Sequence, residues 1–272
     1  MKKFLESVFR FKSILALSSL IAVVGFASFA SASHSWGSYH WARTSNPFTI
    51  KVGNNLTSVW QTSLTTASSD WSASTVIDTA IVPGLKNPRT CKPTLGRIEA
   101  CNSKYGNNGW LGIAQIWTYG SHIAQAVVKL NDTYFNTTKY NKSSWRQLVM
   151  CQEIAHDFGL DHQDSIFTNP NLGTCMDYTN DPTGTAGTNG TLNNEHPNQH
   201  DFDQLVTIYT HLDATNTSFS TTANSSAGNS GDMSERSEWG KEIRKSENGR
   251  HSLFERDLGN GKKVHTFVTW AD

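Results

Sequence analysis

Residues 152–162 combine side-chain types and spacing that suit a zinc ion. Gln152 and His156 are four positions apart, so on a helix their side chains project the same way. Glu153 is then placed to act as a general base on water at the metal. Gly159 allows a turn that returns His162 as a third ligand, and catalytic zinc uses three protein ligands. Gln152 is the weak point, because an amide oxygen is a poorer zinc donor than imidazole.

The segment Gln152–His162 resembles the HExxHxxGxxH signature of the metzincins, a family of zinc endopeptidases, at every defined position except the first. Residues Gly173–Tyr178 resemble the methionine turn of the same family. The resemblance spans roughly residues 46–213 and looks closest to matrixin-like or bacterial metzincin-like proteins.

The resemblance implies a role for each matching residue. His156 and His162 would bind zinc, and Glu153 would polarise the water and shuttle protons. Met176 would form the floor beneath the metal without binding it. In astacin-like and serralysin-like metzincins a tyrosine two residues after this methionine contacts zinc. Tyr178 is therefore a candidate ligand or oxyanion donor, with core packing as the alternative. A peptide substrate would lie antiparallel to the strand predicted at 111–117.

Apolar periodicity predicts the elements that position these residues. Strands are predicted at residues 48–52, 76–82, 97–101, 111–117 and 122–130. Helices are predicted over 56–71, from a capping box at Ser144 and Gln147 onward, and over 202–212. We therefore expect an α+β fold like that of a metzincin. It would have a twisted mixed sheet of about five strands, an active-site helix, a second packing helix and a C-terminal helix.

The two ends of the chain differ in composition from its centre. An apolar run over residues 14–30 follows a basic start and ends in Ala-Ser-Ala, so residues 1–32 are predicted to be a signal peptide. An uncleaved membrane anchor is the alternative. Residues 33–213 would form the catalytic domain and 214–232, rich in small polar residues, a linker. Residues 233–272 would form a small tail, in which Gly259-Asn260-Gly261 predicts a β-hairpin that docks on the domain or on a partner.

Four cysteines in an exported chain favour two disulfides, with three pairings open. We favour Cys91–Cys101, which closes a short loop, and Cys151–Cys175, which links the metal helix to the methionine turn. A four-cysteine zinc site is the rival interpretation, but the sequence has no CxxC pair.

Composition narrows the partners. Lysine plus arginine and aspartate plus glutamate number 23 each, so the formal net charge is zero and nucleic acid is not an expected partner. We expect a secreted monomer that acts on a protein or peptide substrate and has no stable membrane insertion after signal cleavage.

Other functions remain open on sequence alone. Because of Gln152, a metzincin-fold binding protein without protease activity is the main alternative. A third idea is carbohydrate binding by exposed tryptophans. Aspartates 157, 161 and 164 are expected to be surface charges or loop caps. His122 is expected to be a structural or rim histidine, with a substitute metal ligand as the alternative, and His196, His200 and His211 are expected to face solvent rather than bind metal.

Overall fold

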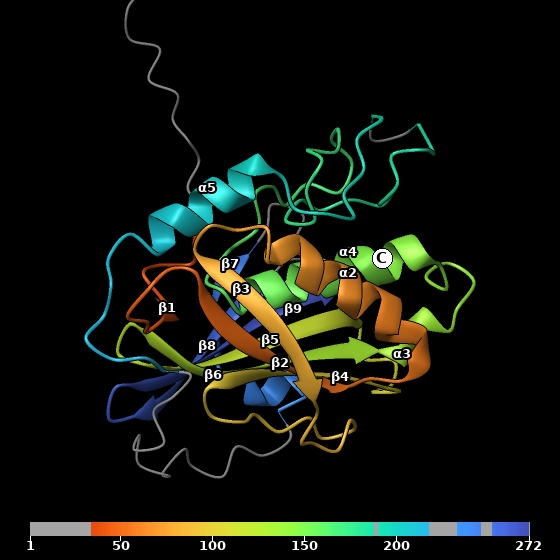
Figure 1. The fold of residues 1–272 in the computed structure, drawn as a ribbon. Helices are drawn as coiled ribbons and strands as arrows, with labels where there is room; N and C mark the ends of the chain where they lie inside the picture. Colours follow the sequence, from red (N-terminus) through yellow and green to blue (C-terminus); the bar gives the residue numbers. More distant parts are fainter. Residues whose placement is uncertain (1–33, 188–189, 218–232, 246–251, 272) are drawn as a thin grey trace, which may run out of the picture. The chain divides into compact units, whose positions relative to one another are not determined.

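A mixed β-sheet organises the computed structural model, which describes residues 34–187, 190–217, 233–245 and 252–271 (Figure 1). The predicted signal peptide, and residues 218–232 of the predicted linker, lie outside the described residues. The strands are β1 (His40–Trp41), β2 (Phe48–Asn55), β3 (Ile77–Pro83), β4 (Arg97–Ser103), β5 (Trp110–Tyr119), β6 (His122–Asn131), β7 (Lys241–Lys245), β8 (Ser252–Gly259) and β9 (Lys262–Trp270). The helices are α2 (Gln61–Trp71), α3 (Asp132–Phe135), α4 (Ser143–His156) and α5 (Gln199–Ile208), with short 3-10 turns η1 (Ser58–Trp60) and η2 (Arg236–Glu238).

The strand order is β3-β2-β4-β6-β5-β9-β8-β7, with β1 paired to the start of β6. Strands β2, β3, β4 and β6 run parallel, and β5 and the C-terminal strands are antiparallel. The α+β class and the mixed sheet are thus confirmed. The expected number of about five strands was wrong, because the described residues form a nine-stranded sheet. The predicted C-terminal hairpin consists of β8 and β9. Strand β9 pairs with β5 and so extends the sheet, and β7 pairs with β8 at its end.

Helices α2 and α4 lie side by side against one face of the sheet (Figure 1). Helix α4 begins at Ser143 with Lys142 as its N-cap and no capping side chain, so the capping box predicted at Ser144 was wrong. Residues Ser144 to His156 are all buried, and Gln152 and His156 both face the sheet, as predicted, since they contact Thr269 and Phe267 of β9.

Helix α5 matches the predicted last helix only in part. It begins with a capping box formed by Asn198 and Asp201 and ends at Ile208. Leu205 is buried, but the neighbouring apolar residue Val206 is 48% exposed. A surface helix needs only a narrow apolar stripe, and periodicity alone overestimates its width.

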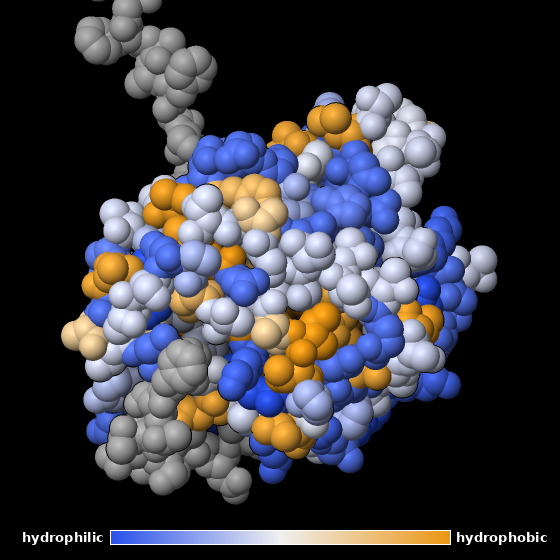
Figure 2. Space-filling view, in the orientation of Figure 1, coloured by the Kyte–Doolittle hydropathy of each residue, from blue (hydrophilic) through white to orange (hydrophobic). Residues whose placement is uncertain are grey.

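Strand β5 is enclosed on all sides. Its edges pair with β6 and β9. One face contributes Leu111 and Ala114 to the main core, and the other packs Ile113 with Trp239 and Val268. Eight of the nine tryptophans in the chain are buried and Trp270 is partly buried, which removes the idea of an exposed tryptophan platform for carbohydrate. The visible surface in Figure 2 is mostly blue and white, with orange atoms in scattered groups.

Both predicted cysteine pairings are confirmed. Cys91–Cys101 and Cys151–Cys175 form disulfides, each with a Cα–Cα distance of 6.0 Å. Paired cysteines are typical of proteins that fold in an oxidising compartment. Among the described residues, none of the helices combines the length and the apolar character needed to cross a bilayer.

Candidate metal centre

The C-terminal end of α4 is closed by contacts that fix the position of His156. The Gly159 amide donates to the His156 carbonyl and the Leu160 amide to the Ala155 carbonyl, which is the Schellman pattern of a helix end. Gly159 has φ of +103°, as its predicted capping role requires, and a Cβ there would lie 2.5 Å from the Tyr39 carbonyl oxygen. The indole N–H of Trp36 also donates to the His156 carbonyl, at 3.1 Å. These bonds satisfy carbonyl groups that a helix end leaves unpaired.

The turn at Gly159 brings His162 against His156. Their Nε2 atoms lie 3.1 Å apart, and both side chains are largely or fully buried. His156 Nδ1 lies 2.8 Å from the Leu160 carbonyl oxygen, which can only accept, so the hydrogen is on Nδ1 and the lone pair is on Nε2. His162 Nδ1 faces the Asp161 carboxylate at 3.5 Å, which favours the same tautomer. With the hydrogen of His162 on Nε2, the two rings form a hydrogen bond; with it on Nδ1, two lone pairs face each other, an arrangement that suits a cation between them.

The protonation state of both rings agrees with a ligand role. Burial lowers the pKa of His156 well below its usual value, and the neighbouring His162 adds to this effect. Burial also lowers the pKa of His162, to about 3, with a further contribution from His34. Both imidazoles are therefore neutral at physiological pH, the form that binds metal.

Gln152 lies one helical turn before His156, where a metzincin has its first histidine. Its Nε2 donates to the Cys175 carbonyl at 2.8 Å, and its Oε1 accepts from the Thr269 hydroxyl at 2.7 Å. The amide nitrogen is thus held by the methionine turn, which leaves the oxygen as the atom that could bind a metal. In the described structure that oxygen is bonded to strand β9.

Glu153 is fully buried beside this amide. Burial raises its pKa to about 8, and the Thr269 hydroxyl and the Ala114 backbone partly oppose this effect. Neither carboxyl oxygen makes a well-formed hydrogen bond among the described residues. A Cβ on Gly112 of β5 would lie 2.7 Å from Glu153 Oε1 and 2.6 Å from Val149 Cγ1. The absence of a side chain at Gly112 is therefore what lets α4 approach the sheet here.

The predicted methionine turn is joined to the metal helix and to the loop after it. The disulfide Cys151–Cys175 makes the first link. Met176 is buried in the main core, and its carbonyl accepts from the amide of Gln163, the residue after His162. The ring of Tyr178 lies 4.3 Å from that of His162, and its hydroxyl donates to the Val268 carbonyl at 3.3 Å.

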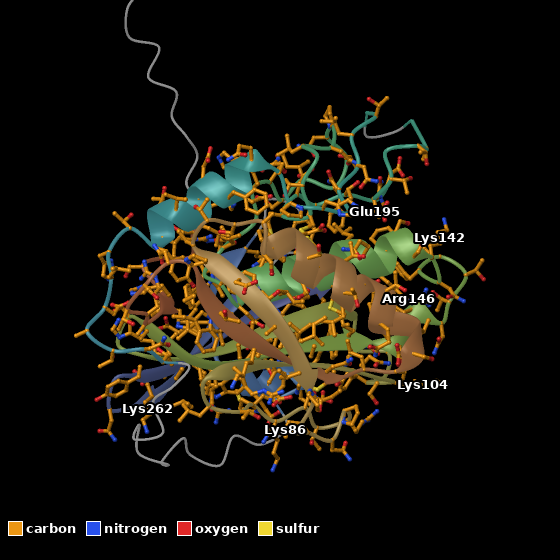
Figure 3. All side chains as sticks on the ribbon, in the orientation of Figure 1. Lys86, Lys104, Lys142, Arg146, Glu195 and Lys262 are labelled. Atoms are coloured by element: carbon orange, nitrogen blue, oxygen red, sulfur yellow. A yellow bond between two sulfur atoms is a disulfide. The ribbon has the colours of Figure 1, made fainter. Side chains whose placement is uncertain are left out.

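Strand β9 covers the centre. It pairs antiparallel with β5 from Trp110 to Tyr119, along the edge where a substrate strand was expected. The Phe267 ring stacks on His156 with a centroid distance of 4.1 Å and an interplanar angle of 11°. The Thr269 hydroxyl meets Gln152 and influences the pKa of both Glu153 and Tyr178. The centre is buried inside the molecule, whereas the labelled Lys104 and Lys142 side chains lie at the outer margin of the ribbon (Figure 3).

The donor set fits zinc at two positions. Zinc–nitrogen bonds of about 2.0 Å in a tetrahedron place two ligand nitrogens about 3.3 Å apart, close to the observed 3.1 Å. A third donor has to come from the Gln152 oxygen or the Tyr178 hydroxyl, and both are bonded to β9.

The expectation that the aspartates here are surface charges or loop caps was wrong for Asp157 and is met by capping at Asp161. Asp157 and Asp161 are buried rather than surface charges. Burial raises the pKa of Asp157 well above its usual value, and Glu153 adds to this. Asp161 forms an ion pair with Arg244 of β7 and accepts from the His162 amide at 2.8 Å, so it does act as a loop cap.

Sequence reasoning missed Gly112, Phe267 and Thr269. The last two alternate along β9, so they share the face that meets α4. The alternation can be seen in the sequence, but the sequence does not reveal that this face of β9 packs against α4.

Comparison with known proteins adds no family: no protein-family model matches this chain, and no curated protein matches it.

Proposed function

We propose that this protein is a secreted zinc-dependent endopeptidase of metzincin type, and that the described structure is its closed form. The observation that carries the proposal is the facing pair of Nε2 atoms of His156 and His162, 3.1 Å apart after a glycine-capped helix. The order of elements supports it: β2, α2, four strands and α4 follow the strand, helix, four strands and helix that the resemblance implies.

The residues of the centre divide the work. His156 and His162 would hold the zinc, with the Gln152 oxygen or the Tyr178 hydroxyl as a further donor once β9 withdraws. Zinc bound there would supply Lewis-acid chemistry at a peptide carbonyl. Glu153 would take the proton from the attacking water and return it to the leaving amine. Once the Val268 carbonyl has moved away with β9, the Tyr178 hydroxyl could donate to the developing oxyanion.

The closed form follows from the position of β9. An extended peptide would add to β5 by main-chain hydrogen bonds, but β9 makes those bonds along the whole strand. Phe267 and Thr269 also occupy the space beside His156 and Gln152. Substrate would therefore bind only after β9 has left β5.

The first test is metal content. The chain from residue 33 onward is purified without added zinc, dialysed and compared with a His156→Asn/His162→Asn variant. We expect the variant to hold one zinc fewer per chain, since the two imidazoles belong to one site. Equal metal content after incubation with micromolar zinc, both in these proteins and in a Phe267→Ala/Thr269→Ala background that weakens the hold of β9, would overturn the proposal.

Hydrolysis of labelled casein tests two proposed roles, that of β9 as the cover of the site and that of Glu153 as the general base. Phe267→Ala/Thr269→Ala should raise hydrolysis at least tenfold, because the loss of both contacts weakens the hold of β9 on the centre and so favours its departure from β5. Thr266→Ala is the matched control, since this buried residue of β9 lies on the opposite face and bonds to Gln115. In the background that carries Phe267→Ala/Thr269→Ala, here called the opened background, Glu153→Ala should abolish hydrolysis and leave zinc content unchanged. Substantial residual hydrolysis would defeat the assignment of Glu153.

A pseudoprotease is the second candidate. The bonding of both ends of the Gln152 amide favours it, because an amide used in this way serves the fold. Gln152→His separates the two candidates in the opened background. If zinc affinity and hydrolysis both rise from nothing, the natural protein is a pseudoprotease that binds rather than cuts. If activity is already present and changes little, Gln152 is a working ligand.

A further inference from the structure

Three histidines converge on one carboxylate oxygen at a place remote in sequence from helix α4. Asp213 Oδ1 lies 3.4 Å from His40 Nε2, 3.1 Å from His122 Nε2 and 3.4 Å from His211 Nε2. His40 belongs to β1 and His122 begins β6, where the two are register partners. His211 and Asp213 follow α5. Three segments of the chain therefore meet at Asp213.

Asp213 is oriented by Arg43. Its Oδ2 accepts from the Arg43 amide at 3.1 Å and from the Arg43 guanidinium at 3.3 Å, and its own amide donates to the Arg43 carbonyl at 2.8 Å. These bonds use one carboxylate oxygen and direct the other, Oδ1, toward the histidines. A ligand carboxylate held by hydrogen bonds to its second oxygen is the usual arrangement in metal sites.

The tautomer of His40 calls for a positive charge, carried by a proton or by a metal ion, between His40 and Asp213. Its Nδ1 lies 2.7 Å from the Ser38 carbonyl oxygen, which can only accept, so the hydrogen is on Nδ1. In the neutral ring the lone pair is then on Nε2, and it faces Asp213 Oδ1, another acceptor, at 3.4 Å. Two acceptors are brought together either by a proton on Nε2 or by a metal ion between them.

The distances fit a metal ion as well as they fit hydrogen bonds. Metal–ligand bonds of about 2.0 Å in a tetrahedron separate the ligand atoms by about 3.3 Å, and the three histidine nitrogens lie 3.1–3.4 Å from Asp213 Oδ1. The ligand atoms of His40, His122 and Asp213 all lie within 4.8 Å of one another. His211 is not in that group, although its Nε2 is near Asp213; its ring is 61% exposed and would have to turn to complete the fourth position.

We propose that His40, His122, His211 and Asp213 bind a divalent transition metal, with zinc as the expected ion. Imidazole nitrogens with one carboxylate suit zinc better than calcium or magnesium, which prefer all-oxygen sites. Four protein ligands fill a tetrahedron and leave no position for a reactant, so the site would be structural. It would fasten the segment after α5 to the N-terminal strand and to the start of β6. On sequence alone, His122 and His211 are not expected to bind metal.

Cobalt titration of the chain from residue 33 onward tests this site separately from the first. The background is His156→Asn/His162→Asn, so that failure of the proposed catalytic centre leaves the test intact. We expect about one cobalt per chain, with the visible absorption of a tetrahedral site. His211→Asn should weaken the binding at least tenfold, and His122→Asn/Asp213→Asn should abolish it. His196→Asn, which removes another exposed histidine paired with an aspartate, is the matched control and should change nothing.

Two outcomes would overturn the proposal. The first is the absence of cobalt binding at pH 8 in the background protein, which would mean that a proton joins His40 to Asp213. The second is binding that His211→Asn and His196→Asn alter equally. Because the His211 side chain is exposed, its variant is expected to fold, and unchanged thermal unfolding in chelator would verify this.

Discussion

Acid should destabilise this protein through a buried histidine of the covering strand, His265. Its ring lies on β9 against Trp36 and Tyr39, with centroid distances of 4.8 and 4.5 Å. Its Nε2 lies 3.3 Å from the Thr118 hydroxyl of β5. Burial lowers the pKa of His265 to about 4, and Lys263 also lowers it, whereas Glu255 acts in the opposite direction. A charged ring is therefore disfavoured where β9 meets β5.

The sign of the effect follows from the two pKa values. The folded-state pKa of about 4 lies below the unfolded-state value of 6.5, so unfolding takes up a proton between these limits. The stabilising contribution is complete above pH 6.5 and is lost as the pH falls to about 4. At 1.36 kcal/mol per pKa unit the loss amounts to at most roughly 3 kcal/mol.

Denaturant unfolding of the chelated chain between pH 7.5 and 4 measures this contribution. His265→Gln keeps a neutral amide that cannot take up a proton, so its free energy of unfolding should fall less steeply with acid. Glu255→Gln should steepen the fall, because it removes the carboxylate that opposes the shift. Other buried histidines contribute equally to wild type and variant, so the comparison isolates His265. Parallel curves for wild type and His265→Gln would refute the reasoning.

Two further predictions concern the positions around α4. Gly112→Ala should cost about 1–3 kcal/mol of unfolding free energy through overpacking against Val149 and Glu153, as measured by chemical denaturation; an unchanged midpoint would show that α4 shifts freely. Cys151→Ser/Cys175→Ser should cost roughly 3 kcal/mol, as expected for a bridge between residues 24 apart in sequence. It should also weaken zinc binding at His156 and His162 if the methionine turn positions that site, and unaltered affinity would contradict this role.

Strands β2 to β6 and the turn that ends α4 could be predicted because each is specified by residues close together in the sequence. The β-branched and alternating runs predicted β2 through β6, and the spacing of His156 from Gly159 predicted the capped turn that returns His162. The two cysteine pairs could be favoured over the other pairings for separate reasons. Cys91 and Cys101 are close in sequence, and Cys151 and Cys175 lie in the metal helix and the methionine turn, which the resemblance places together. The helix start was wrong because Lys142 adopts the N-cap position without a side-chain bond, which composition does not reveal.

The pairing of β9 with β5 could not be read from the sequence, because strand partners are chosen by contacts more than a hundred residues apart. One signal was present. Val264 and Val268 lie on one face of β9 and Phe267 on the other, and all three are buried. A hairpin lying on a surface would need apolar side chains on one face only. The cluster at Asp213 had no such signal, since His40 and Asp213 are 173 residues apart.

Closure of β5 by β9 also determines which strand edge the molecule presents to other molecules. The outer strand at that end of the sheet is β7, where Lys241, Arg244 and Lys245 are exposed. A row of positive charges on an edge strand resists pairing with another sheet. The edge of β5 that β9 covers instead belongs to a strand with apolar side chains on both faces, among them Leu111, Ile113 and Ile116. Departure of β9 would therefore replace a charged edge with an apolar one, and the opened protein should be far more prone to aggregate than the closed one.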